Sequence, residues 1–236
     1  MPRSDAPAAA WRERGGLLQE ERLLALGLRH GFAAKRAGDM ACAPQRRRAA
    51  AALGLPEPLL LKQVHGTAIL RAAPENAGRE ADGWLIDAPG VCAAVYAADC
   101  VPLFLWSDDG RLAGVFHAGW RGTAAGMAKA AVAAFAARGV GPERLSAALG
   151  PHAGPCCYRV GPELEKEFPA SAFARRDGGL CLDLGAENRR QLAAAGVPAG
   201  ALGAPAPCTI CEPESYHSFR RDGRGARMLA LLSIDR

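Results

Sequence analysis

Histidine and aromatic residues are scarce in this chain of 236 residues, which contains five histidines and has an aromatic content of 6%. So few rings leave little for stacking on nucleic-acid bases. The formal net charge of +5 is also a modest surplus, and its only tight basic run, residues 46–48, is typical of the solvated face of a helix. We therefore expect no nucleic-acid partner, although some arginines could bind a phosphate-bearing small molecule.

Long apolar runs are absent as well. The longest, such as residues 130–137, fall far short of the roughly 20 residues that span a bilayer. The first 14 residues lack the apolar core of a signal peptide and carry acidic residues that transit peptides avoid. We expect a cytoplasmic protein with no membrane partner, and the sequence leaves the oligomeric state open.

The order of apolar runs predicts a mixed α+β fold. Buried strands are expected at 59–64, 91–97, 101–106, 112–117 and 226–234, and helices at 123–138, 162–168 and 186–195. These segments do not alternate as regular βαβ units, which favours mixed sheets packed with helices. We expect one compact domain over 1–236, with disorder in residues 1–15 and a long loop at 196–207.

Three segments place unusual residues near expected strand ends, and they carry His65, Cys100 and His117. Their separations are too long for a zinc finger and suit ligands brought together by a sheet. Two histidines and one cysteine are ligands that zinc accepts, and three protein ligands leave a fourth position open, as in catalytic sites. Spacing alone leaves the alternative that all three are structural, because buried free cysteines are common. Asp99 precedes Cys100 and is a candidate proton shuttle.

The other cysteines predict no metal site. Eight cysteines in a chain without a recognisable leader favour thiols over a disulfide framework. Cys208 and Cys211 have the spacing of half a zinc site, but no second pair follows at a suitable distance. Cys156 and Cys157 are adjacent, and we expect them to pack as small hydrophobic residues.

Several motifs together resemble a known family. They occupy 61–66, 81–83, 94–105, 114–126, 149–164, 181–198 and 216–227. In this order they are similar to the bacterial laccase-domain proteins, also called multicopper polyphenol oxidase-like proteins and related to the peptidoglycan editing factor. Members are described as purine nucleoside phosphorylases and adenosine deaminases. The resemblance implies a sandwich fold like that of cysteine hydrolases, with zinc, or alternatively copper, bound by His65, Cys100 and His117.

The resemblance also implies the substrates, which are a purine nucleoside and phosphate. The expected reactions are phosphorolysis of adenosine, inosine and methylthioadenosine, and deamination of adenosine. Arg121, with Lys35 or Arg36, is expected to hold the phosphate. Independently of the resemblance, the polar stretch at 215–227 carries four arginines and is either a solvated loop or part of a binding wall, because arginine suits phosphate or carboxylate. The chain departs from the family pattern after Phe32, where a shortened loop at 39–44 could alter specificity.

Three alternatives remain at this point. A copper oxidase could use the same three ligands, although a multicopper laccase needs many closely paired histidines and this chain has five. A cysteine amidase acting on a peptidoglycan precursor could use Cys100 as nucleophile, with His117 or His65 as its base. A binding protein without activity is the third.

Overall fold

Two five-stranded sheets form the centre of the computed structural model, which describes residues 11–223 and 225–235. The first sheet has the order β1-β2-β3-β13-β6, and the second has the order β4-β5-β8-β7-β9. The strands of the first sheet, in that order, are Trp11–Arg14, Leu17–Glu20, Arg29–Ala33, Met228–Ser233 and Ala93–Ala97. Those of the second are Ile69–Arg71, Gly83–Ile86, Ala113–Ala118, Val101–Ser107 and Leu145–Leu149.

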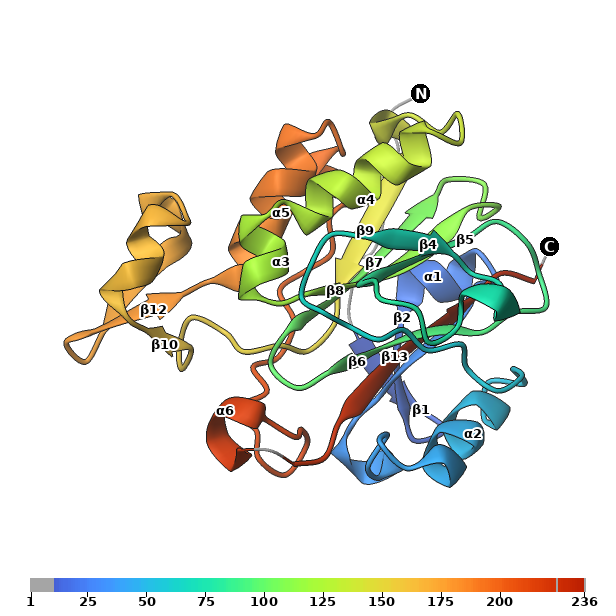
Figure 1. Cartoon of the computed structure of the whole chain (residues 1–236), viewed down its shortest axis with the longest axis horizontal. Helices are drawn as coiled ribbons and strands as arrows, with labels where there is room; N and C mark the ends of the chain where they lie inside the picture. The colour runs from blue at the N-terminus through green and yellow to red at the C-terminus, as the bar shows by residue number, and fades with distance from the viewer. Residues whose placement is uncertain (1–10, 224, 236) are drawn as a thin grey trace.

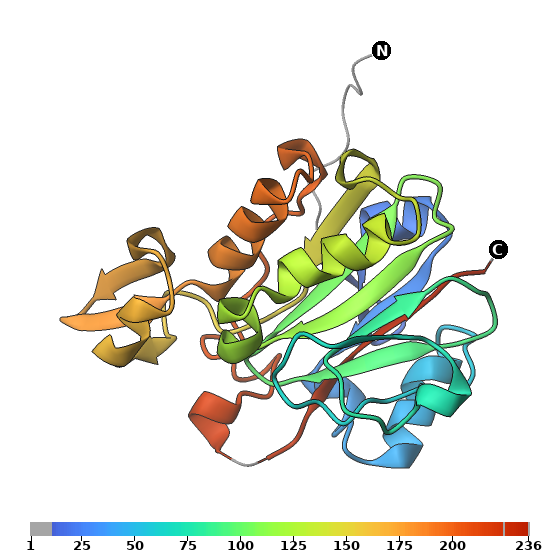
Figure 2. The same cartoon turned by 45° about the horizontal axis from the view of Figure 1, so that its top comes forward.

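The two sheets pack face to face with helices outside them, as Figures 1 and 2 show. The alternation of side chains along β7 explains the layers. Phe104 and Trp106 are buried in the core between the sheets, whereas Leu103 and Leu105 are buried in the core beneath the helices α4 (Met127–Ala136) and α5 (Leu184–Ala194). A third core lies between the first sheet and helix α2 (Ala43–Ala51). The result is an α+β sandwich, as the sequence predicts, in which the named strands of the first sheet are antiparallel and the second sheet is mixed through its parallel pair β4–β5.

Helices are short in the described part of the chain. They are α1 to α6, at Glu21–Ala25, Ala43–Ala51, Trp120–Ala124, Met127–Ala136, Leu184–Ala194 and Phe219–Asp222. A smaller three-stranded sheet projects from the body (Figure 1) and is formed by β10, β12 and β11, at Arg159–Val160, Gly179–Leu182 and Phe173–Arg176. No helix among the described residues is long and apolar enough to cross a membrane.

Several expected elements differ from the structure. Residues 59–64 form only isolated bridges, from Leu59 and Lys62, instead of a strand. The helix expected over 123–138 begins earlier and is divided into α3 and α4, because Gly126 adopts a left-handed conformation with φ of 88°. The segment expected over 162–168 is a 3-10 helix, Pro162–Lys166.

The N-terminal expectation is also corrected where it can be checked. Trp11–Arg14 pairs as β1, and the Trp11 indole N–H donates to the carbonyl of Leu149 at 2.8 Å. The predicted disorder of residues 1–10 lies outside the described residues. By contrast, the apolar runs at 91–97, 101–106, 112–117 and 226–234 correspond to β6, β7, β8 and β13.

Candidate metal centre

His65, Cys100 and His117 converge at one end of the layer between the two sheets. Their potential ligand atoms all lie within 4.8 Å of one another, and the two imidazole rings are edge to face with centroids 4.8 Å apart. His117 comes from β8, and Cys100 immediately precedes β7. His65 comes from a loop instead of a strand end, and its backbone is left-handed with φ of 62°. The structure thus brings together residues that are far apart in the sequence.

Asp82 holds both histidines of this group in place. It was not among the site residues predicted from the sequence. Its Oδ1 lies 2.8 Å from Nδ1 of His117, and this contact leaves Nε2 of that ring free to face the other ligands. Its two oxygens also accept the backbone N–H groups of Val64, His65 and Gly66. A carboxylate that orients a ligating histidine is common in metal sites. The only sequence signal for it was its place in the motif at 81–83.

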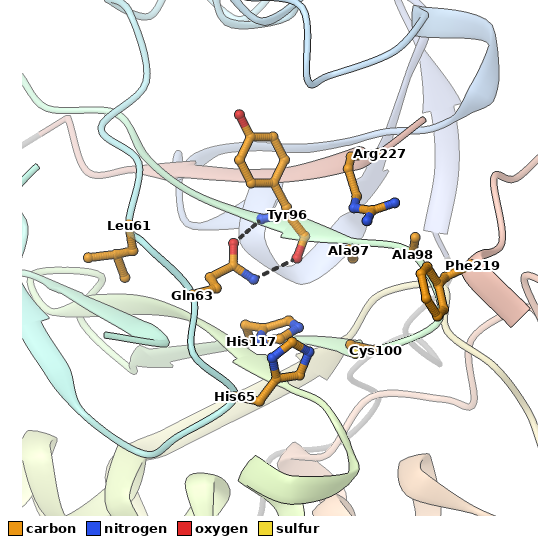
Figure 3. A pocket seen from close by; sticks show the side chains of 10 residues that line it. All are labelled: Leu61, Gln63, His65, Tyr96, Ala97, Ala98, Cys100, His117, Phe219 and Arg227. Atoms are coloured by element: carbon orange, nitrogen blue, oxygen red, sulfur yellow. Dashed lines mark hydrogen bonds between the residues drawn. The ribbon is translucent and has the colours of Figure 1, made fainter. Parts of the chain in front are cut away.

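Gln63 fixes the same loop from the other side. Its side-chain amide donates to the carbonyl of Tyr96 at 3.0 Å and accepts the N–H of Tyr96 at 2.7 Å (Figure 3). The amide therefore takes the place of a backbone strand partner for β6. This explains why residues 59–64, although apolar, need not form a strand to hold His65 beside the sheet.

The electrostatics of the three ligands favour a bound cation. Burial opposes ionisation of the Cys100 thiol, but the charges and hydrogen bonds of His117 and His65 outweigh burial and lower its pKa to about 6. Burial also disfavours the His117 imidazolium, yet Cys100 and Asp82 raise its pKa to about 9. The thiolate is therefore readily formed, and a metal ion would displace the imidazole proton.

Space around the ligands is restricted at Gly119. A Cβ atom there would lie 2.9 Å from the sulfur of Cys100 and 2.9 Å from Cδ2 of His65. Only glycine lets the chain pass so close to both ligands. The donor types, their convergence, the Asp82 contact and this clearance all fit a zinc ion, which accepts histidine nitrogen and cysteine sulfur in a tetrahedral arrangement.

The three ligands line a cavity of about 390 Å³, which is within the usual size range for small-molecule sites. Arg227 and Phe219 lie across the cavity from the two histidines (Figure 3). Both belong to the polar stretch at 215–227, and the Arg227 guanidinium lies 5.7 Å from the centre of the Phe219 ring. Phe219 is 48% exposed, which is unusual for a large apolar side chain. A larger hollow of about 600 Å³ near α1 contains no histidine or cysteine.

The other predicted site residues lie elsewhere. Arg121 is exposed in α3, with its guanidinium over the Trp120 ring, and does not line the cavity. Lys35 donates to the carbonyl of Pro213, and Arg36 lines a separate small hollow. The structure therefore does not bring the three expected phosphate-binding side chains to the candidate metal ligands, and among the described residues that line this cavity Arg227 carries the positive charge.

Asp99, the expected proton shuttle, does not line the cavity. The buried carboxylate accepts hydrogen bonds from the hydroxyls of Thr209 and Ser218, at 2.6 and 3.0 Å, and from the backbone N–H of Arg220 at 2.6 Å. Its backbone has φ of 85°, which is rare for a residue other than glycine. These contacts tie the start of β7 to the segment at 209–220.

Comparison with known proteins places the chain in a family. The family profile described as "Multi-copper polyphenol oxidoreductase laccase" matches residues 33–235. The chain belongs to this family. "Purine nucleoside phosphorylase YlmD" of Geobacillus stearothermophilus is 37% identical over 209 residues, covering 79% of this chain and 76% of the relative.

Two further comparisons found similar proteins. "Adenosine deaminase RL5", from an unknown prokaryotic organism, is 38% identical over 142 residues, covering 57% of this chain and 54% of that protein. The crystal structure of YlmD from G. stearothermophilus superposes with a TM-score of 0.87 at 31% identity, covering 98% of this chain and all of that one. The family and fold expected from the motifs are confirmed.

Proposed function

We propose that this chain is a metal-dependent purine nucleoside enzyme that phosphorolyses adenosine, inosine and methylthioadenosine and deaminates adenosine. The observation that carries the proposal is the placement of His65, Cys100 and His117 in a cavity that also presents an aromatic ring and an arginine. The names of the two relatives, a purine nucleoside phosphorylase and an adenosine deaminase, support the same class of substrate.

The side chains across the cavity suit the two parts of the substrate. The exposed Phe219 ring offers a face on which a purine can stack. The Arg227 guanidinium can form a paired set of hydrogen bonds with phosphate, which lysine cannot do in the same geometry. In phosphorolysis a phosphate oxygen forms a bond to C1′ of the ribose while the C1′–N9 bond breaks and the purine takes up a proton. In deamination, water adds at C6 and ammonia leaves.

The three ligands would hold zinc, and Asp82 would keep His117 oriented toward it. When bound, the ion supplies a Lewis acid and a means of activating water at neutral pH. The residues of this chain do the rest: Gln63 and Asp82 keep His65 in register, Gly119 leaves room for the ligands, and Arg227 holds phosphate. Copper is the alternative ion for the same ligands.

Product analysis tests this function. Metal-replete protein is incubated with adenosine, with and without phosphate, and the products are separated by chromatography and identified by mass. Adenine that forms only with phosphate supports phosphorolysis, and inosine supports deamination. Cys100→Ala should lose the metal and both activities, whereas Cys42→Ala, at an exposed free cysteine outside the site, should retain them. Absence of both products from metal-replete wild type would contradict the proposal.

The pKa values of Cys100 and His117 favour one second candidate. A thiol with a pKa of about 6 beside an imidazole with a pKa of about 9 can form the ion pair of a cysteine hydrolase. An amidase of this kind, acting on a peptidoglycan precursor, would survive chelation and be inactivated by thiol alkylation at Cys100. The nucleoside enzyme would lose its activity on chelation and regain it with zinc.

A further inference from the structure

A second group of cysteines, outside the cavity, converges in the same way. The sulfur atoms of Cys156, Cys157, Cys208 and Cys211 all lie within 4.8 Å of one another. The sulfur of Cys211 is 3.2 Å from that of Cys156 and 3.1 Å from that of Cys157. All four are free thiols. From the sequence, neither pair was expected to bind a metal. Cys156 and Cys157 are adjacent, and Cys208 and Cys211 form an isolated pair, so neither has the spacing of a known zinc motif.

The fold explains how the two pairs meet. The segment that leads from β9 to β10 runs beside the segment that leads into α6 (Figures 1 and 2), and His152 and Cys208 form a parallel bridge between them. The N–H of His152 donates to the carbonyl of Pro207, and the N–H of Thr209 donates to the carbonyl of His152. Each segment then turns so that its cysteines face those of the other.

The geometry suits one metal ion. Four thiolates at about 2.3 Å from a tetrahedral zinc ion are about 3.8 Å apart, and the observed separations, from 3.1 Å to below 4.8 Å, span this value. The cysteines of an iron–sulfur cluster bind to two or four different iron atoms, so they would be spread more widely. We propose that Cys156, Cys157, Cys208 and Cys211 form a structural zinc site, separate from the site in the cavity.

A backbone donor already faces one of the four sulfur atoms. The N–H of Gly154 donates to the sulfur of Cys208 at 3.2 Å. Such a contact stabilises a thiolate, which is the form in which cysteine binds a metal. Four thiolates this close together would repel one another without a cation, which a zinc ion would supply.

The site would fasten the segment that supports Asp99. Thr209, next to Cys208, donates its hydroxyl to Asp99, and the N–H of Ala153 donates to the Asp99 carbonyl. Arg221 also binds the carbonyls of Thr209 and Ile210 and contributes positive charge near the cluster. Since Asp99 precedes Cys100, the tetracysteine site would stabilise one ligand of the cavity site from outside.

Metal counting tests the inference and does not depend on nucleoside chemistry. Full-length protein, purified under reducing conditions with zinc and without chelator, is analysed by elemental mass spectrometry. We expect two zinc equivalents in the wild type and in Cys42→Ser, one in Cys208→Ser/Cys211→Ser, one in His65→Ala/Cys100→Ser, and none in the combined variant. One equivalent in the wild type that disappears with His65→Ala/Cys100→Ser would overturn the proposal.

A second measurement avoids any variant of the cluster itself, which could fail to fold. X-ray absorption at the zinc edge of His65→Ala/Cys100→Ser should show sulfur neighbours only, at about 2.3 Å. The assignment would be refuted by nitrogen or oxygen neighbours, or by iron in place of zinc. It would also be refuted if the four cysteines formed disulfides in freshly reduced protein. Failure of the nucleoside assay would leave this result unaffected.

Discussion

Replacing Asp82 by asparagine isolates the contribution of one buried carboxylate to the cavity site. The carboxylate is fully buried and receives four hydrogen bonds, two at each oxygen. Oδ1 serves His65 N–H and His117, while Oδ2 serves the N–H groups of Val64 and Gly66. Asparagine has the same shape but only one acceptor oxygen. If this oxygen stays beside His117, the amide NH₂ must face two N–H donors.

The magnitude follows from these lost contacts. A hydrogen bond to a charged group contributes about 1.5–3 kcal/mol. Because the loop is partly exposed, with Val64 at 46%, we use the lower end for the two contacts to Oδ2 and expect a loss of about 3 kcal/mol in unfolding free energy. Substitution of a residue that orients a metal ligand lowers metal affinity by about 10- to 100-fold. Turnover should fall with metal occupancy at limiting zinc.

Two assays check this expectation. Zinc affinity is measured by competition with a chromogenic chelator, and unfolding free energy by urea titration of the metal-free protein. Glu80→Gln is the matched control, because it makes the same carboxylate-to-amide change two residues away at an exposed pair with Lys62. That control should behave as wild type in both assays. If Asp82→Asn bound zinc as tightly as wild type and was equally stable, the role assigned to Asp82 would be wrong.

Three further predictions concern other parts of the molecule. Gly119→Ala should weaken zinc binding by at least about 10-fold in the same competition assay, because its methyl group would meet the side chains of Cys100 and His65. Gly200→Ala is the control and should bind zinc normally, because a Cβ atom at that position would meet nothing within 4 Å. Steady-state kinetics should show that Arg227→Gln raises the KM for phosphate about 10-fold or more, whereas Arg121→Gln leaves it unchanged. If only Arg121→Gln raised this KM, the phosphate would be held by Arg121, as predicted from the sequence. Burial lowers the pKa values of His30, His152 and His217, so the unfolded chain binds more protons below about pH 6.5. Urea titrations should therefore find stability falling as pH drops below that value, by up to about 1.4 kcal/mol per pH unit for each of these groups, and constant stability would contradict this.

The sequence predicted those parts of the fold in which local pattern and final environment agree. The apolar runs at 91–97, 101–106 and 112–117 became β6, β7 and β8, because each is covered on both faces. The run at 59–64 begins with three leucines, but a side-chain amide, from Gln63, satisfies the neighbouring strand in its place. The broken helix was missed because the left-handed Gly126 lies within an alanine-rich pattern that otherwise continues without interruption.

The sequence could predict those residues of the candidate site whose chemistry is evident from the residue type alone. Two histidines and a cysteine stand out as metal ligands in any order, and the motifs supported them. Asp82 does not stand out, because an aspartate acquires its role only from the side chains it faces. The polar stretch at 215–227 was a candidate binding wall from sequence alone, and its residues Phe219 and Arg227 line the cavity. Arg121 follows the motif that contains His117, but it stacks on Trp120 instead of lining the cavity.

Asp99 shows how far a residue's contacts can lie from its neighbours in the chain. It precedes a candidate metal ligand and carries a carboxylate, so sequence suggests proton transfer, and in the structure its oxygens accept three donors from the segment at 209–220. Its left-handed backbone, with φ of 85°, lies in the turn just before β7. The same segment carries Cys211, with Cys208 directly before it, and the cysteines that these two meet follow Ala153, which donates to the Asp99 carbonyl. The candidate ligand Cys100 is thus held in place from outside the cavity, through contacts that span more than 100 positions of the chain.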